Sequence, residues 1–129
     1  MFLKLSLLLA LCVCFVFVEG CRKPQQSWVE PIVAHEIAPQ PPRVGPVTLT
    51  LQLTDFSGAA VTGAQLAVEA NMSHAGMVPV FAEAKEIEPG RYRSVMQLSM
   101  AGDWTVTVRG TWSRDRKMDY TFEINGVEP

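Results

Sequence analysis

The chain has 129 residues, a formal net charge of −2 and three cysteines. This length suits one domain with a single modest core. The small net charge gives no indication of a strongly basic surface, which is typical of nucleic-acid-binding proteins, so we expect no nucleic-acid partner.

The first 20 residues have the parts of a bacterial lipoprotein signal. Lys4 supplies the positive charge, residues 5–18 form an uncharged and largely apolar run, and Gly20 places a small residue before Cys21. A signal peptidase requires a small residue of this kind beside the cut. Residues 1–20 are therefore predicted to be a signal peptide. Cys21 is predicted to carry the lipid that holds the mature protein on a membrane of the bacterial cell envelope, facing the periplasm or the exterior.

An uncleaved anchor helix is the alternative for this segment. The apolar run 5–18 is shorter than the roughly 20 residues that span a bilayer, which favours the signal peptide. Lipidation would use the thiol of Cys21, and Cys12 and Cys14 would leave with the signal. Disulfides, thiolate metal sites and cysteine nucleophiles are therefore not expected in the mature protein.

Residues 21–46 are predicted to be a tether. They hold six of the nine prolines, and proline blocks helix formation and favours extended, semi-rigid chain. Within the tether, the apolar residues of segment 28–37 allow it to dock as an edge strand. Pro31 would keep that strand at an edge, because proline cannot donate to a ladder of hydrogen bonds.

Residues 47–129 are predicted to form an antiparallel β-sandwich of immunoglobulin-like type. Apolar and polar side chains alternate along residues 47–54, which is typical of a half-buried strand. Further short strands, separated by turn signals, are expected at 64–70, 78–85, 91–98, 104–109 and 118–124. This repetition of short strands and turns is characteristic of sandwiches. The side chains expected in the core are Tyr92, Met96, Leu98, Trp104 and Val106.

The segment 71–77, Asn-Met-Ser-His-Ala-Gly-Met, combines two thioethers and an imidazole within six residues. The thioether sulfurs of Met72 and Met77 are soft ligands that favour Cu(I), and the imidazole of His74 binds either oxidation state of copper. Zinc and magnesium would require other ligands. Copper, with Cu(I) preferred, is therefore the ion that this mixture selects.

The geometry of the segment decides which residues can share an ion. In an extended chain Met72 and His74 point to the same face, whereas Met77 joins them only if the chain folds back. Gly76 is a residue that permits such a turn. Met100, in the loop before Trp104, is a candidate for a fourth ligand.

Three motifs in the run 65–104 resemble the YtkA-like domain, a relative of the FixH proteins. They are the Met/His segment 71–77, the Pro-Gly-Arg-Tyr sequence at 89–92 and the Ser-Met-Ala-Gly-Asp-Trp sequence at 99–104. The resemblance extends from Val47 to the end of the chain. It implies a small extracytoplasmic β-sandwich, lipid- or membrane-anchored, with a role in copper handling or in the assembly of copper oxidases. It also implies that Met72, His74, Met77 and Met100 are the positions of interest.

Catalytic arrangements have little support in the sequence. The chain has two histidines, His35 and His74, and His35 lies in the predicted tether, so no Ser-His-Asp set can be assembled. The acidic stretch 83–88 is better explained as a solvated strand edge than as a pair of general acid and base. We therefore do not expect an enzyme.

Two functions from different classes remain. The first is a lipid-anchored, extracytoplasmic protein that captures copper, or passes it to a receiving protein, through the Met/His segment. The second is a metal-free interaction module whose sheet edge docks onto a membrane complex, with the methionines as apolar contact surface.

Overall fold

The structure, a computed structural model, describes residues 30–74, 76–113 and 116–129. These residues form seven strands: β1 (Ile32–Ala38), β2 (Gly45–Thr54), β3 (Gln65–Met72), β4 (Val80–Glu88), β5 (Arg91–Leu98), β6 (Gly102–Trp112) and β7 (Arg116–Val127). Every pair of neighbouring strands is antiparallel. The prediction of an all-β antiparallel domain is confirmed. Within the described ranges no helix has the length and apolar character needed to cross a membrane.

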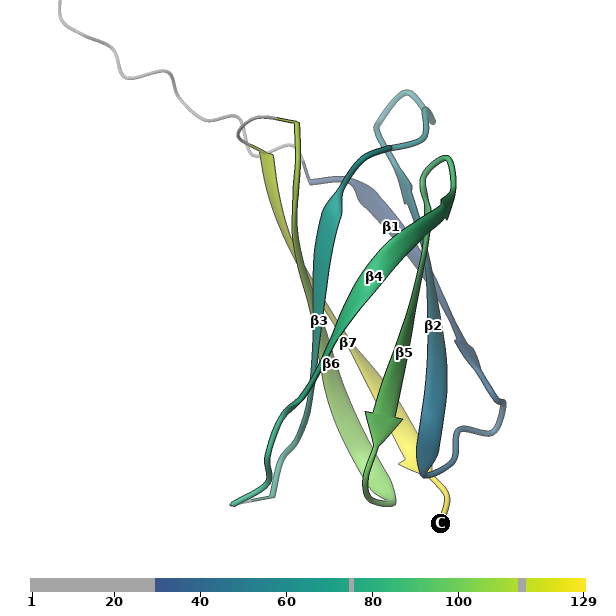
Figure 1. Cartoon of the computed structure of the whole chain (residues 1–129), viewed down its shortest axis with the longest axis vertical. Helices are drawn as coiled ribbons and strands as arrows, with labels where there is room; N and C mark the ends of the chain where they lie inside the picture. Colours follow the sequence, from purple (N-terminus) through teal and green to yellow (C-terminus); the bar gives the residue numbers. More distant parts are fainter. Residues whose placement is uncertain (1–29, 75, 114–115) are drawn as a thin grey trace, which may run out of the picture.

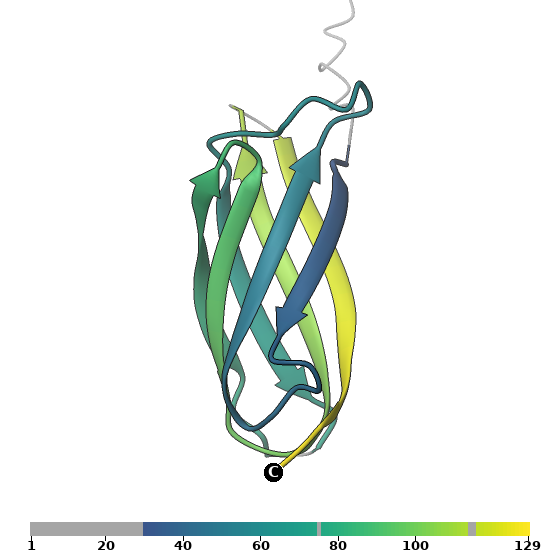
Figure 2. The ribbon, with the colours of Figure 1, turned by 90° about the vertical axis from the view of Figure 1, so that its right-hand side faces the viewer.

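The strands form one sheet in the order β1-β2-β5-β4-β3-β6-β7, which curls into a nearly closed barrel (Figures 1 and 2). The predicted layering as a two-sheet immunoglobulin-like sandwich is therefore wrong. The cause is β4, because residues 80–84 pair with β3 whereas residues 85–88 pair with β5. By changing partner along its length, this strand joins the two halves that a sandwich keeps separate.

The barrel closes where its two edge strands, β1 and β7, approach each other. The N–H of Val44 donates to the carbonyl of Glu128 (2.8 Å), and the N–H of Glu128 donates to the carbonyl of Pro42 (2.9 Å). The connection between β1 and β2 is thereby hydrogen-bonded to the chain that follows β7. These bonds cover one end of the gap between the edges.

The core consists of the inward-facing side chains of the alternating strands. Val47, Leu49, Leu51 and Leu53 of β2 are all fully buried. The predicted core residues Tyr92, Met96, Leu98, Trp104 and Val106 are at most 1 % exposed, which confirms the expectation from their alternation with polar neighbours.

β1 lies within the segment that was predicted as a tether. It pairs with β2 from Ile32 opposite Thr54 to Ala38 opposite Thr48, at the sheet edge anticipated from Pro31. Val33 and Ile37 pack against the core, so this segment gains enough apolar contact to join the sheet. The predicted signal peptide and Cys21 lie outside the described residues.

The barrel has two ends. One end carries the connections 39–44, 73–79 and 99–101 together with the C-terminus, and we call it the Met/His end; it is the lower end in Figure 1. The other end carries the connection 55–64, the turn between β4 and β5, and the ends of β6 and β7 that face each other; we call it the hairpin end. β1 also begins at the hairpin end, where Ile32 lies opposite Thr54 (Figure 1).

Candidate metal site at the Met/His end

The loop that carries the candidate ligands folds back on itself. The N–H of Met77 donates to the carbonyl of His74 (3.4 Å), and Gly76 between them has φ +80°. This left-handed conformation is open to glycine and disfavoured for other residues. The reversal that the sequence required for Met77 to join the other ligands is therefore present.

The four candidate ligands divide between core and solvent. Met72, the last residue of β3, is 8 % exposed, and Met77 packs partly buried against the core. His74 is exposed, and Met100 is 47 % exposed. Two different loops of this end therefore present an imidazole and one thioether to solvent, whereas the other two thioethers pack against the end of the core.

Trp104 ties the two loops of this end together. Its indole Nε1–H donates to the carbonyl of Met100 (3.0 Å), and in the sheet register it lies opposite Met72. Gly102 has φ +123°, and a Cβ placed on it would lie 3.0 Å from Cε of Met72. Met72 and the turn with Met100 are thus held against the same part of β6, although they are far apart in the sequence.

The donor types at this end fit a soft ion. Three thioethers and one imidazole match the preference of Cu(I). Mg²⁺ and Ca²⁺ prefer oxygen ligands to thioether sulfur. Among the described residues, no three His, Cys, Asp or Glu side chains form a metal-binding group. Because Met72 and Met77 face the core, both side chains would have to turn their sulfur towards the loop. Methionine can do so, since its side chain has three rotatable bonds.

A histidine that was assigned to the tether occupies a structured site between β1 and β7. The ring of His35 stacks on Phe122, with 4.0 Å between centroids and 21° between planes. Its Nδ1 lies 2.8 Å from the hydroxyl of Tyr120. Burial lowers the pKa of His35 from its ordinary value. The period-two spacing of Val33, His35 and Ile37 was the sequence signal that could have revealed this contact between the edge strands.

At the hairpin end, Tyr92 and Glu86 brace the connection 55–64. The Tyr92 hydroxyl donates to the carbonyl of Val61 (2.8 Å) and accepts from the N–H of Ala64 (3.0 Å). The Glu86 carboxylate accepts from the N–H of Gly63 (3.2 Å). Burial, opposed by the bond from Ala64 and reinforced by Glu86, raises the pKa of Tyr92 to about 12. Glu86 thus has a structural partner in the connection 55–64.

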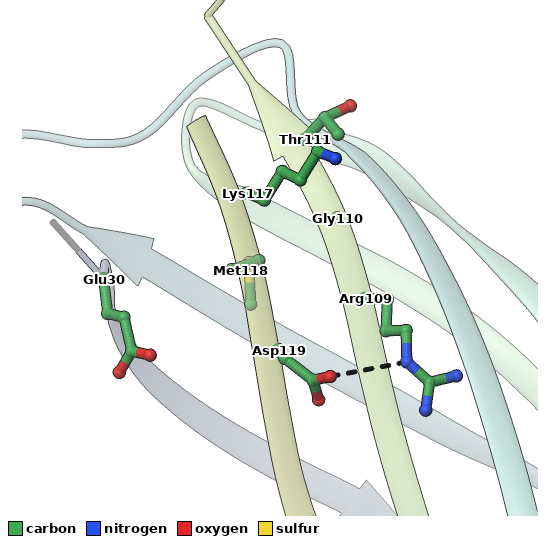
Figure 3. A pocket seen from close by; sticks show the side chains of 7 residues that line it. All are labelled: Glu30, Arg109, Gly110, Thr111, Lys117, Met118 and Asp119. Carbon is green, nitrogen blue, oxygen red and sulfur yellow. Dashed lines mark hydrogen bonds and ion pairs between the residues drawn. The ribbon is translucent and has the colours of Figure 1, made fainter. Parts of the chain in front are cut away.

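An open pocket of about 440 Å³ lies near the hairpin end (Figure 3). Its lining residues are Glu30, Arg109, Gly110, Thr111, Lys117, Met118 and Asp119. The guanidinium of Arg109 already pairs with Glu69 (2.8 Å) and Asp119 (3.4 Å). The described lining contains no histidine or cysteine, and we assign no reaction to this pocket.

A protein-family model described as YtkA-like matches residues 30–109, more than half of the chain. The chain belongs to the YtkA-like family. The matched range starts before β1 and includes both the Met/His loop and the turn that precedes Trp104. The resemblance read from the sequence began at Val47, whereas the family range includes β1 as well. A search of curated proteins returned no match to the chain.

Proposed function

We propose that this YtkA-like protein is a lipid-anchored, extracytoplasmic copper-binding protein that captures Cu(I) or hands it on at the Met/His end. The observation that carries the proposal is the shared attachment of two loops to Trp104, because the register pairs it with Met72 and its indole binds the backbone of Met100. Four soft or borderline donors thereby belong to one end of the barrel. The turn at Gly76 supports the inclusion of Met77.

The exposure of the four side chains suggests an order of binding. His74 and Met100 are accessible from solvent and would make the first contacts with an arriving ion. Met72 and Met77 would then complete the coordination from the core side. A site that is open to solvent and rich in thioethers suits exchange of the ion with another protein.

Competition against a Cu(I) chelator tests the proposal on the purified full chain. We expect the triple variant Met72→Ala, His74→Ala, Met77→Ala to lose most of the Cu(I) affinity of the wild type, and Zn(II) to compete poorly. The single variant His74→Ala should weaken binding and remove most of its decline in acid, because a protonated imidazole cannot ligate a metal.

The matched control is Met96→Leu. Met96 is a fully buried methionine of β5, so this change should leave the Cu(I) affinity nearly unchanged. Equal affinity in the wild type and the triple variant would reject the copper site.

A metal-free interaction module is the second candidate. It is favoured by two large apolar side chains beside the same loop, Val78 and Phe81, which are 78 % and 72 % exposed. If the triple variant binds Cu(I) as the wild type does, this second function becomes the better account of the Met/His end.

A further inference from the structure

The ladder between β4 and β5 stops part-way along both strands. The paired residues run from Glu88 opposite Arg91 to Lys85 opposite Arg93. Beyond this point, residues 80–84 of β4 pair with β3 alone, and residues 94–98 of β5 pair with β2 alone. The two strands diverge towards the Met/His end (Figure 1). We call these two facing, unpaired edges the β4–β5 seam.

The change of partner along β4 creates a second opening, between β3 and β4 at the hairpin end, and that opening is bridged. There Glu86 accepts from the backbone of Gly63, and Tyr92 accepts from the backbone of Ala64. Among the described residues, no hydrogen bond joins residues 80–84 to residues 94–98. The chain thus bridges one opening with a bond to its own loop and leaves the other with free backbone donors and acceptors.

The seam lacks most of the features that protect an exposed strand edge. Proteins block such edges with charged residues, prolines or bulges. Residues 94–98 contain no charge and no proline, and Glu83 is the one charge in residues 80–84. Phe81 and Val95 are on the outer faces of the two strands and are 72 % and 49 % exposed. An extended segment added here would gain apolar contacts in addition to backbone hydrogen bonds.

The closed end of the seam is cationic. Lys85 and Arg93 are register partners and both are exposed, which places two like charges opposite each other, an arrangement that is unfavourable without an acidic neighbour. Glu83 on β4 offsets one of these charges at most. No salt bridge to Lys85 or Arg93 is formed within the described residues. A carboxylate from a partner would therefore be favoured at this point.

We propose that the β4–β5 seam is a docking site for an extended segment of a partner protein, which adds as a strand beside β4 or β5. The partner segment would carry alternating apolar side chains for Phe81 and Val95 and an acidic residue or terminal carboxylate for Lys85 and Arg93. The proposal does not depend on copper binding. The seam thus defines the edge at which a partner would bind and the chemistry that the partner would need. The Met/His loop lies at the open end of the same seam.

Amide hydrogen exchange on the purified full chain tests the seam directly. Without a ligand, about half of the amides in residues 80–84 and 94–98 should exchange fast, because alternate residues of a strand point towards the open edge. A seven-residue probe peptide of alternating valine and threonine that ends in two aspartates should then slow exchange in these two segments. A peptide with two lysines in place of the aspartates should bind several-fold more weakly at low salt.

Two surface substitutions provide the variant and its control. Phe81→Thr removes an apolar contact from the seam without adding a charge and should reduce affinity for the acidic peptide several-fold. Phe56→Thr, at a side chain that is 74 % exposed at the hairpin end, should leave it unchanged. Slow exchange in both segments of the free protein, peptide protection at another edge, or equal loss in the two variants would each overturn the proposal. Cu(I) affinity measured on the same proteins reports separately on the metal site.

Discussion

Trp104 joins the hydrophobic core to the Met/His end. Its side chain is 1 % exposed, while its indole N–H holds the backbone of Met100. The same residue therefore contributes apolar burial and fixes a loop that carries a candidate ligand. The aromatic ring supplies most of the stabilisation, since a neutral hydrogen bond contributes about 1 kcal/mol.

Trp104→Ala is expected to lower the free energy of unfolding by about 3–5 kcal/mol, because it leaves a large cavity among packed side chains. Urea unfolding of the full chain measures this loss. Trp104→Phe retains an aromatic ring and should lose less. A loss below about 1 kcal/mol for Trp104→Ala would mean that the ring is not part of the rigid core.

We expect His35 to make the stability of the barrel sensitive to acid. Burial lowers the pKa of His35 in the folded state, so folding favours the neutral ring. Its contribution is fully present above the unfolded pKa of about 6.5 and is lost as the pH falls from that value through the lowered folded pKa. Stability to urea should therefore decline between pH 7.5 and pH 5.

The variant His35→Phe should lack this contribution to the decline, since phenylalanine can stack on Phe122 but does not titrate. His74→Ala should retain it. If His35→Phe and the wild type have the same pH profile, His35 does not link protonation to stability.

At the scale of the strands, the brace at Tyr92 holds β5 to the connection 55–64. Tyr92→Phe would leave the N–H of Ala64 and the carbonyl of Val61 without this partner, at a cost of about 1–3 kcal/mol. Because the folded pKa of Tyr92 is raised to about 12, its stabilisation is present below the unfolded value of about 10 and is lost as the pH rises towards 12. Urea midpoints at pH 7 and pH 11 should differ less for Tyr92→Phe than for the wild type.

The strands themselves could be predicted from the sequence, whereas the closure of the barrel could not. Alternation along β2 and β5 identified both strands and their buried faces, because each strand has one face in the core. The same alternation occurs in sandwiches and barrels. What separates the two is the change of partner within β4 near Lys85. The alternation of apolar and polar residues slips there, where Lys85 is followed by Glu86, but such a slip does not identify the new partner.

The candidate site could be predicted only in part, because local spacing can be read from the sequence but strand register cannot. Residue types and local spacing indicated the Met/His segment, and Gly76 indicated its turn. The approach of Met100 to the same end depends on the register between β3 and β6, which pairs Met72 with Trp104 across 32 positions. Sequence spacing does not specify such a register. The contact of His35 with Tyr120 and Phe122 arises only when the two edge strands meet.

For the whole molecule, the positions of the two ends set how an anchored protein would face its surroundings. The first strand, β1, begins at the hairpin end, and the Met/His loop lies at the opposite end (Figure 1). β2 has ten residues, so the two ends are separated by roughly 30 Å. An anchor before residue 30 would therefore place the hairpin end towards the membrane and the Met/His end towards a partner.

Cys21→Ser is expected to release the protein from the membrane fraction or to leave it unprocessed, because the apolar run 5–18 is short for a spanning helix. Fractionation of cells that express each form is the measurement. Recovery of the variant in membranes at the mature size would show that lipid on Cys21 is not the anchor.

The orientation gives a matched test on the membrane-bound chain. Ser99 at the Met/His end and Thr62 at the hairpin end are both exposed, so Ser99→Cys and Thr62→Cys can each carry a reactive thiol. With a bulky maleimide reagent, and relative to the chain without an added thiol, Ser99→Cys should react equally fast on membranes and in detergent. Thr62→Cys should react more slowly on membranes, because the bilayer shields that end. If the membrane slows the reaction of Ser99→Cys more than that of Thr62→Cys, the orientation is reversed and the candidate copper site faces the lipid.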